Sequence, residues 1–86
     1  MTAQDRITRT LDAAFHPARL NVVDESHLHK GHAGARPEGE THFRVTIAAS
    51  AFDGKSRIEA HRMVNGALAG EFERGLHALA IRIEKP

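Results

Sequence analysis

Apolar residues return at every fourth position near the start of the sequence, at Ala3, Ile7, Leu11 and Phe15. Residues four apart share one face of a helix, so this spacing predicts a helix over residues 2–15. Thr2 can cap its first turn, and Pro17 disfavours helical backbone at His16. We therefore expect an amphipathic helix that ends before the proline.

Three later segments have the composition or the two-residue alternation of strands. Residues 19–25 contain the short apolar stretch Leu20, Val22 and Val23. Residues 41–49 alternate, and the side expected to be buried carries Phe43, Val45, Ile47 and Ala49. Residues 77–84 alternate again, with one side formed by Leu79, Ile81 and Ile83. These patterns predict three strands.

A second helix is predicted over residues 57–74. Ser56 and Glu59 have the spacing of a capping box, in which each side chain bonds to the other residue's backbone amide. Gly75 is a suitable terminator. The side expected to face the core carries Val64, Leu68 and Phe72.

The expected role of glycine differs between segments of the chain. Gly66 and Gly70 lie inside the second predicted helix, where each costs about 1 kcal/mol relative to alanine, and we expect them to allow close approach to the sheet. The pair Asp53-Gly54 predicts a turn within the connection 50–55. Residues 27–40 are rich in glycine and read as a loop that is long for a connection between two strands.

The predicted order is α-β-β-α-β, an α+β fold in which helices cover one face of a three-stranded sheet. Residues 1–86 are expected to form a single domain, with no internal repeat. A chain of this length builds one modest core, which favours a surface site or a partner interface over the deep pocket of an enzyme. The prediction is a binding protein without catalytic activity.

Composition excludes several kinds of site. The chain has no cysteine, so it cannot form a disulfide, a thiol nucleophile or an all-thiolate metal site from its own residues. A net charge of +1 is well short of the basic character of a dedicated nucleic-acid-binding protein. No apolar run approaches the roughly 18 residues of a membrane span, and no signal peptide is evident, so a cytoplasmic protein is expected.

Histidine is the residue with unusual abundance, at seven in 86 residues. His27, His29 and His32 lie close together in the predicted loop 27–40. His61 precedes Val64 by three residues and therefore lies on or beside the buried face of the second helix. The positive potential at a helix N-terminus disfavours protonated imidazole and leaves a lone pair available to a metal. Alone, such a histidine is more often a packed or solvated side chain.

Several segments resemble the BolA-like family. The most specific is Phe52-Asp53-Gly54-Lys55 followed by His61-Arg62-Met63-Val64. The others are Val22-Val23-Asp24-Glu25-Ser26, Glu40-Thr41-His42-Phe43-Arg44-Val45, Ser50-Ala51 and His77-Ala78-Leu79-Ala80. Together with the first helix they cover nearly the whole chain.

The resemblance implies a fold similar to the class II KH domain and a function without catalysis. BolA-like proteins pair with monothiol glutaredoxins around a shared 2Fe-2S cluster, to which the partner and its glutathione supply thiolates and the BolA-like chain supplies nitrogen. By resemblance, His61 is one cluster ligand and His32 the other, with His29 as the alternative to His32. The implied role is cluster assembly and trafficking, or iron sensing. Imidazole ligands raise the cluster potential and make binding sensitive to pH.

The remaining histidines are given other roles. His16 lies at a helix C-terminus, where partial positive charge is favourable. His42 is expected on the solvated side of its strand, and His77 opens the third strand. Both are interpreted as surface or hydrogen-bonding residues, although both also match positions of the family.

The alternative function is that of a DNA-binding transcriptional regulator of stress or morphology genes. Lys55, Arg57 and Arg62 could form a small basic patch at the start of the second helix, although an ordinary solvated helix end is the preferred interpretation. The sequence Gly31-His32-Ala33-Gly34 matches the glycine-x-x-glycine pattern of the KH phosphate loop. It lies between predicted strands, whereas the KH loop lies between two helices.

A zinc hydrolase using Asp24, Glu25, His27 and His29 is disfavoured, since no nucleophile or enclosing pocket is identifiable. A homodimer bridged by a metal through loop histidines is compatible with the pattern. The sequence leaves the DNA target and the oligomeric state open.

Overall fold

The computed structural model describes residues 2–26 and 41–86. The predictions for His27, His29 and His32, and for the sequence Gly31–Gly34, concern residues outside these ranges. The elements are α1 (Ala3–Phe15), β1 (Arg19–Asp24), β2 (His42–Ala48), the 3-10 turn η2 (Ser50–Phe52), α2 (Arg57–Ala67), α3 (Ala69–Arg74) and β3 (Ala78–Glu84). The predicted order α-β-β-α-β is confirmed, with the last helix divided in two.

The sheet of the described residues has the order β1-β2-β3. β2 pairs antiparallel with β1, which places Val22 opposite Val45, and parallel with β3, which places Val45 beside Ile81. Because side chains alternate along each strand, these three residues lie on the same face. The parallel pair needs a long crossover, which α2 and α3 supply.

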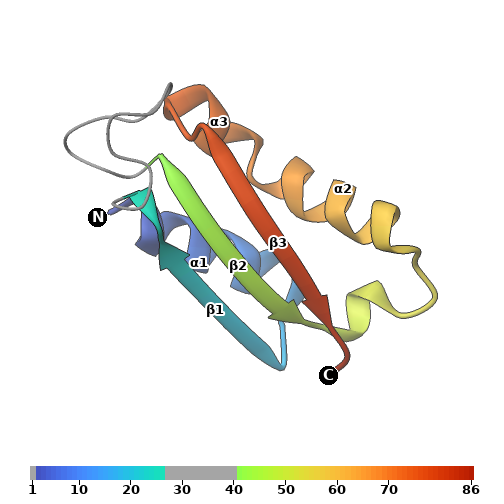
Figure 1. Cartoon of the computed structure of the whole chain (residues 1–86). Coiled ribbons are helices and arrows are strands. Elements are labelled where there is room, and N and C mark those ends of the chain that lie inside the picture. Colours follow the sequence, from blue (N-terminus) through green and yellow to red (C-terminus); the bar gives the residue numbers. More distant parts are fainter. Residues whose placement is uncertain (1, 27–40) are drawn as a thin grey trace.

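The helices cover that apolar face. Figure 1 shows α1 crossing behind β1 and β2 while α2 and α3 run alongside β3. Ile7 and Leu11 of α1 and Val64 of α2 are fully buried together with Val45 and Ile47 of β2. The opposite face of the sheet exposes Asn21, Arg44, Ala80 and Arg82. The predicted one-sided arrangement is therefore confirmed.

Both long helices begin with a capping box. The Thr2 hydroxyl accepts from the amide of Asp5 at 3.1 Å, and the Ser56 hydroxyl accepts from the amide of Glu59 at 3.1 Å. Each carboxylate accepts in return from the backbone amide of its cap, which holds the pKa of Asp5 and that of Glu59 below their ordinary values. These bonds satisfy amides that have no partner inside the helix.

The prediction of one uninterrupted helix over 57–74 is wrong, because α2 ends at Ala67 and α3 begins at Ala69. At Leu68 the amide reaches back to the carbonyls of Val64 and Asn65, and the residue itself is buried. Glycine weakens helices, and Gly66 and Gly70 flank the break. The helix therefore changes course where a buried leucine lies between two glycines.

Two further expectations for this region are wrong, one for the glycines and one for Phe72. A side chain at Gly66 or Gly70 would meet nothing within 4 Å, so neither glycine serves a close approach to the sheet. Phe72 is 38% exposed and does not face the core. Its neighbour Glu71 is turned inward instead, to 9% exposure.

Glu71 is buried because Arg6 reaches it from α1. The guanidinium donates from Nε to Oε2 at 2.9 Å and from Nη2 to Oε1 at 3.1 Å. Such a two-point bond fixes orientation as well as distance. The contact joins residues 65 positions apart in the chain and holds α3 against α1.

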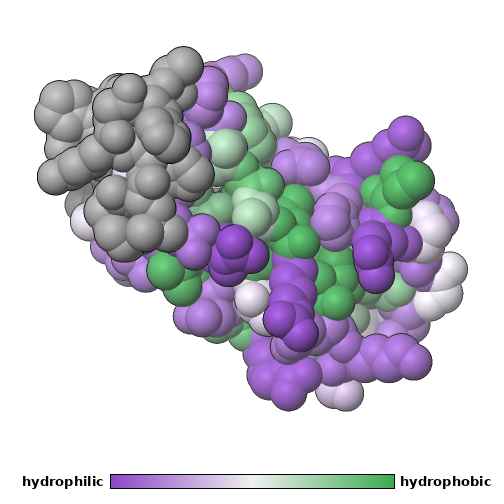
Figure 2. Space-filling model, in the orientation of Figure 1, coloured by the Kyte–Doolittle hydropathy of each residue, from purple (hydrophilic) through white to green (hydrophobic). Residues whose placement is uncertain are grey.

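The surface carries a hydrophobic band between polar regions. Figure 2 shows this band between β3 and α2, where Leu79, Ile81, Ile83, Met63 and Ala67 are half-buried. None of the helices in ranges 2–26 and 41–86 is both long and apolar enough to cross a membrane.

Replacing Ile47 by alanine is expected to lower the free energy of unfolding by about 2 to 5 kcal/mol, because the side chain is fully buried in the centre of the sheet. The matched control is Ile58→Ala on α2, where 65% of the residue is exposed. Its effect should stay within about 0.5 kcal/mol. Urea unfolding followed by circular dichroism measures both. Equal losses would contradict the assignment of the core.

Candidate functional site

The ends of β1 and β2 that flank residues 27–40 are held together by the hydroxyl of Ser26. Its oxygen accepts from the amide of Thr41 at 2.9 Å and from the amide of His42 at 3.1 Å. The Ser26 amide in turn donates to Asp24 Oδ1 at 2.9 Å. Ser26 is only 6% exposed, so these bonds are shielded from water. We call Ser26, Thr41, His42 and His77 the loop base.

His42 is buried in the loop base at 6% exposure. The expectation of a solvated side chain is wrong, whereas the expected hydrogen-bonding role is confirmed. Alternation places it on the uncovered face of the sheet, but at this end the ring of His77 packs against it and the Thr41 hydroxyl lies 2.8 Å from Nδ1. Alternation predicts the face on which a side chain lies, but not what covers a residue at the beginning of a strand.

His77 lies exposed at the same place. Its amide donates to the carbonyl of Thr41 at 2.8 Å, and its ring centroid is 5.3 Å from that of His42. Sequence reasoning gave His77 no ligand role. The place of His77 could have been predicted from the topology, because parallel neighbouring strands begin at the same end of a sheet. The residue before β3 therefore lies beside the residue that closes segment 27–40.

His61 lies at a different part of the molecule, half-buried on α2. Its neighbour Ala60 lines a hollow together with Ile83 and Glu84, at the end of β3. β3 spans about 20 Å at the usual rise of strand residues, and the loop base is at its beginning. His61 therefore belongs to α2 and is not part of the loop base, and its ligand role stays a prediction.

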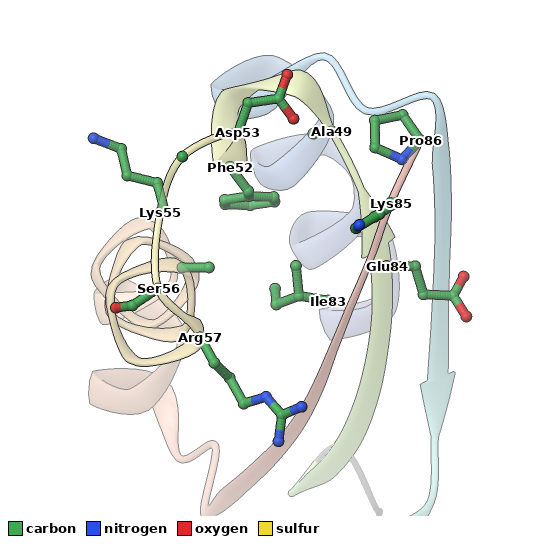
Figure 3. Close-up of a pocket in the computed structure, with 12 residues that line it drawn as sticks. Ala49, Phe52, Asp53, Lys55, Ser56, Arg57, Ile83, Glu84, Lys85 and Pro86 are labelled. Atoms are coloured by element: carbon green, nitrogen blue, oxygen red, sulfur yellow. The ribbon is translucent and has the colours of Figure 1, made fainter.

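The predicted basic residues also belong to the end of the molecule where α2 begins. Lys55, Arg57 and Arg62 are all exposed. Lys55 and Arg57 line the hollow of about 770 Å³, but Figure 3 shows Lys55 pointing away from it while Phe52 and Ile83 point inward. The hollow is lined by polar and apolar groups alike, and Lys55 and Arg57 point in different directions there.

Within ranges 2–26 and 41–86 no three histidine or carboxylate side chains are close enough to hold a metal ion together. The two carboxylates considered for a zinc hydrolase have structural partners, since Asp24 accepts from Ser26 and Glu25 pairs with Arg44 at 3.2 Å. A metal ion that binds His77 and needs three or more ligands must therefore take at least one ligand from outside these ranges. An exposed imidazole suits a site completed by a partner protein.

Comparison with known proteins identifies the family. A family model described as BolA-like protein matches residues 11–86. The chain belongs to the BolA-like protein family. The resemblance seen in the sequence is confirmed, and the match includes both the loop base and α2.

Individual BolA-like relatives agree with this assignment. "Uncharacterized protein in cobS 5'region" of Sinorhizobium sp is 47% identical over 87 residues, covering 100% of this chain and 94% of the relative. "DNA-binding transcriptional regulator BolA" of Escherichia coli is 41% identical over 81 residues, covering 94% and 73%. The solved BolA domain of SufE1 from Arabidopsis thaliana matches with a TM-score of 0.90 at 38% identity, covering 100% and 94%.

Replacing Ser26 by alanine is expected to destabilise this BolA-like protein by about 1 to 3 kcal/mol, because the amides of Thr41 and His42 would lose their buried acceptor. Ser50→Ala, at an exposed position of η2, is the control and should change little. Urea unfolding compares the two variants. If they unfold alike, Ser26 does not hold the loop base together.

Proposed function

We propose that this BolA-like protein is a non-enzymatic adaptor that shares a 2Fe-2S cluster with a monothiol glutaredoxin, in iron-sulfur cluster assembly and trafficking or in iron sensing. The observation that carries the proposal is the exposed imidazole of His77, attached through its backbone to the residue that closes the histidine-rich segment 27–40. The loop base offers nitrogen at the surface, where a partner can approach.

The donor set fits a shared cluster better than a cluster held by this chain alone. The chain has no cysteine, and 2Fe-2S clusters in proteins are held largely by thiolates. The glutaredoxin and its glutathione would supply these thiolates. Two imidazoles on one iron would raise the reduction potential, as in Rieske centres.

His77 and one histidine of segment 27–40 are the ligands that this proposal favours. His32 is the preferred loop ligand and His29 the alternative, as the family resemblance implies. His61, the ligand expected by resemblance, is retained as the alternative to His77. A ligating imidazole must be neutral, so cluster binding should weaken as the solution is acidified.

Anaerobic reconstitution of the protein with a monothiol glutaredoxin and glutathione tests the proposal. The wild-type mixture is expected to give a heterodimer whose absorption and circular dichroism differ from those of the glutaredoxin homodimer. His77→Ala should abolish this spectrum because one nitrogen ligand is lost. His32→Ala or His29→Ala should alter it according to which one is the second ligand.

His61→Ala is the matched variant, because it removes an imidazole from α2, outside the loop base. If His61→Ala abolishes the spectrum and His77→Ala does not, the ligand is His61 and the geometric argument fails. If no heterodimer forms, or if every histidine can be removed without effect, the adaptor function itself is wrong. Far-UV circular dichroism of each metal-free variant establishes that it is folded.

A second candidate function is DNA binding. It is favoured by the name of the 41% identical Escherichia coli relative, "DNA-binding transcriptional regulator BolA", and by the exposed Lys55, Arg57 and Arg62 at the start of α2. Amides at a helix N-terminus and cationic side chains both favour phosphate. The scattered orientation of the cations makes this the weaker candidate.

Selection from a random duplex library at physiological salt tests DNA binding. If the protein is a regulator, a preferred sequence should emerge, and the triple variant Lys55→Ala, Arg57→Ala and Arg62→Ala should weaken its binding at least tenfold, as expected when several phosphate contacts are lost. A variant that neutralises Arg9, Arg44 and Arg74 removes the same charge from exposed positions outside the start of α2. Equal losses for both variants, or no preferred sequence, would indicate only general electrostatic attraction.

A further inference from the structure

The ring of His42 packs against the ring of His77, and the proposed function has so far given this contact no role. Its ring centroid lies 5.3 Å from that of His77, with the two ring planes inclined by 54°. We propose that His42 is a positioning residue, which holds the imidazole of His77 in the orientation needed for ligation. This inference rests on the proposed function through the ligand role of His77.

His42 is itself fixed by several bonds. Its amide donates to Ser26 Oγ at 3.1 Å, and its carbonyl accepts from the amide of Glu25 at 2.8 Å. On the ring, Nδ1 is bonded to the hydroxyl of Thr41 at 2.8 Å. With 6% exposure, His42 has little freedom to change rotamer. It therefore presents a fixed ring to its neighbour.

Among residues 2–26 and 41–86, the contacts of His77 are with Thr41 and His42. Its backbone is attached to the carbonyl of Thr41, yet the residue is exposed, and an exposed histidine ordinarily samples several side-chain rotamers. The separation and inclination of the two rings are those of a favourable tilted pair. Contact with the fixed His42 ring favours the rotamers of His77 that keep this pairing.

Thr41 connects the two histidines. Its carbonyl accepts from the amide of His77, and its hydroxyl bonds to Nδ1 of His42. One residue thus sets both the backbone position of the exposed ring and the orientation of the ring that packs on it. Groups that orient a metal-ligating histidine commonly change metal affinity by 10–100-fold when they are removed.

Two substitutions separate the effect of the ring from that of the bond to Thr41. His42→Phe keeps an aromatic ring and loses Nδ1, while His42→Leu loses both. If the ring contact positions His77, the leucine variant should release the His77 side chain and the phenylalanine variant should retain its order. Leu11→Ala, a core substitution on α1, controls for general loss of stability.

The first measurement uses the metal-free protein. Side-chain couplings and ring chemical shifts of His77 by NMR should indicate one dominant rotamer in the wild type and in His42→Phe, and rotamer averaging in His42→Leu. Averaging in the wild type would overturn the inference without any variant, so the test does not depend on His42→Leu being folded.

The second measurement is the rate of cluster loss from the heterodimer with the glutaredoxin. We expect about tenfold faster loss for His42→Leu and less than twofold change for His42→Phe and Leu11→Ala. Equal rates for all three would overturn the positioning role while leaving His77 as a ligand. If His77→Ala has no effect on the cluster, the proposed ligand fails instead, and that outcome is separate from the NMR result on the metal-free protein.

Discussion

The two-sided pairing of β2 is the constraint on which the rest of the structure depends. β2 is antiparallel to β1 and parallel to β3, so β1 ends where β2 and β3 begin. Ser26, Thr41 and His77 are therefore brought to one end of the sheet although they are distant in sequence. The three hydrogen-bond acceptors there, the Ser26 hydroxyl and the Thr41 and His42 carbonyls, bind the strand ends together.

The same pairing gives the molecule two chemically different ends. A parallel β3 requires the chain to return along the sheet through α2 and α3, so α2 begins where β3 finishes. The basic residues Lys55 and Arg57 lie at that far end. Histidine chemistry at the loop base and cationic chemistry at the start of α2 are thus separated by the length of a strand, and a ligand that needs both would have to span the sheet.

The loop base combines a buried, fixed histidine with an exposed one. Buried hydroxyl and amide groups fix His42, whereas the neighbouring His77 is open to solvent. Bonds that are shielded from water are stronger and more costly to lose than exposed ones. Under the proposed function, an imidazole on such a support would meet a partner's thiolates without first being ordered, which would reduce the entropic cost of assembling a shared site.

The sequence by itself determined the first helix and its cap at Thr2, the three strands, the capping box of Ser56 and Glu59, and the one-sided sheet. These follow from local spacing and from the burial of alternate residues. The family could also be predicted from its motifs. The break at Leu68 did not show in the apolar spacing. The burial of Glu71 depends on its contact with Arg6, which lies 65 positions away. The burial of His42 and its contact with His77 were likewise decided only by tertiary structure, because strand alternation gives a side chain its face while the pairing of distant strands decides what lies against it.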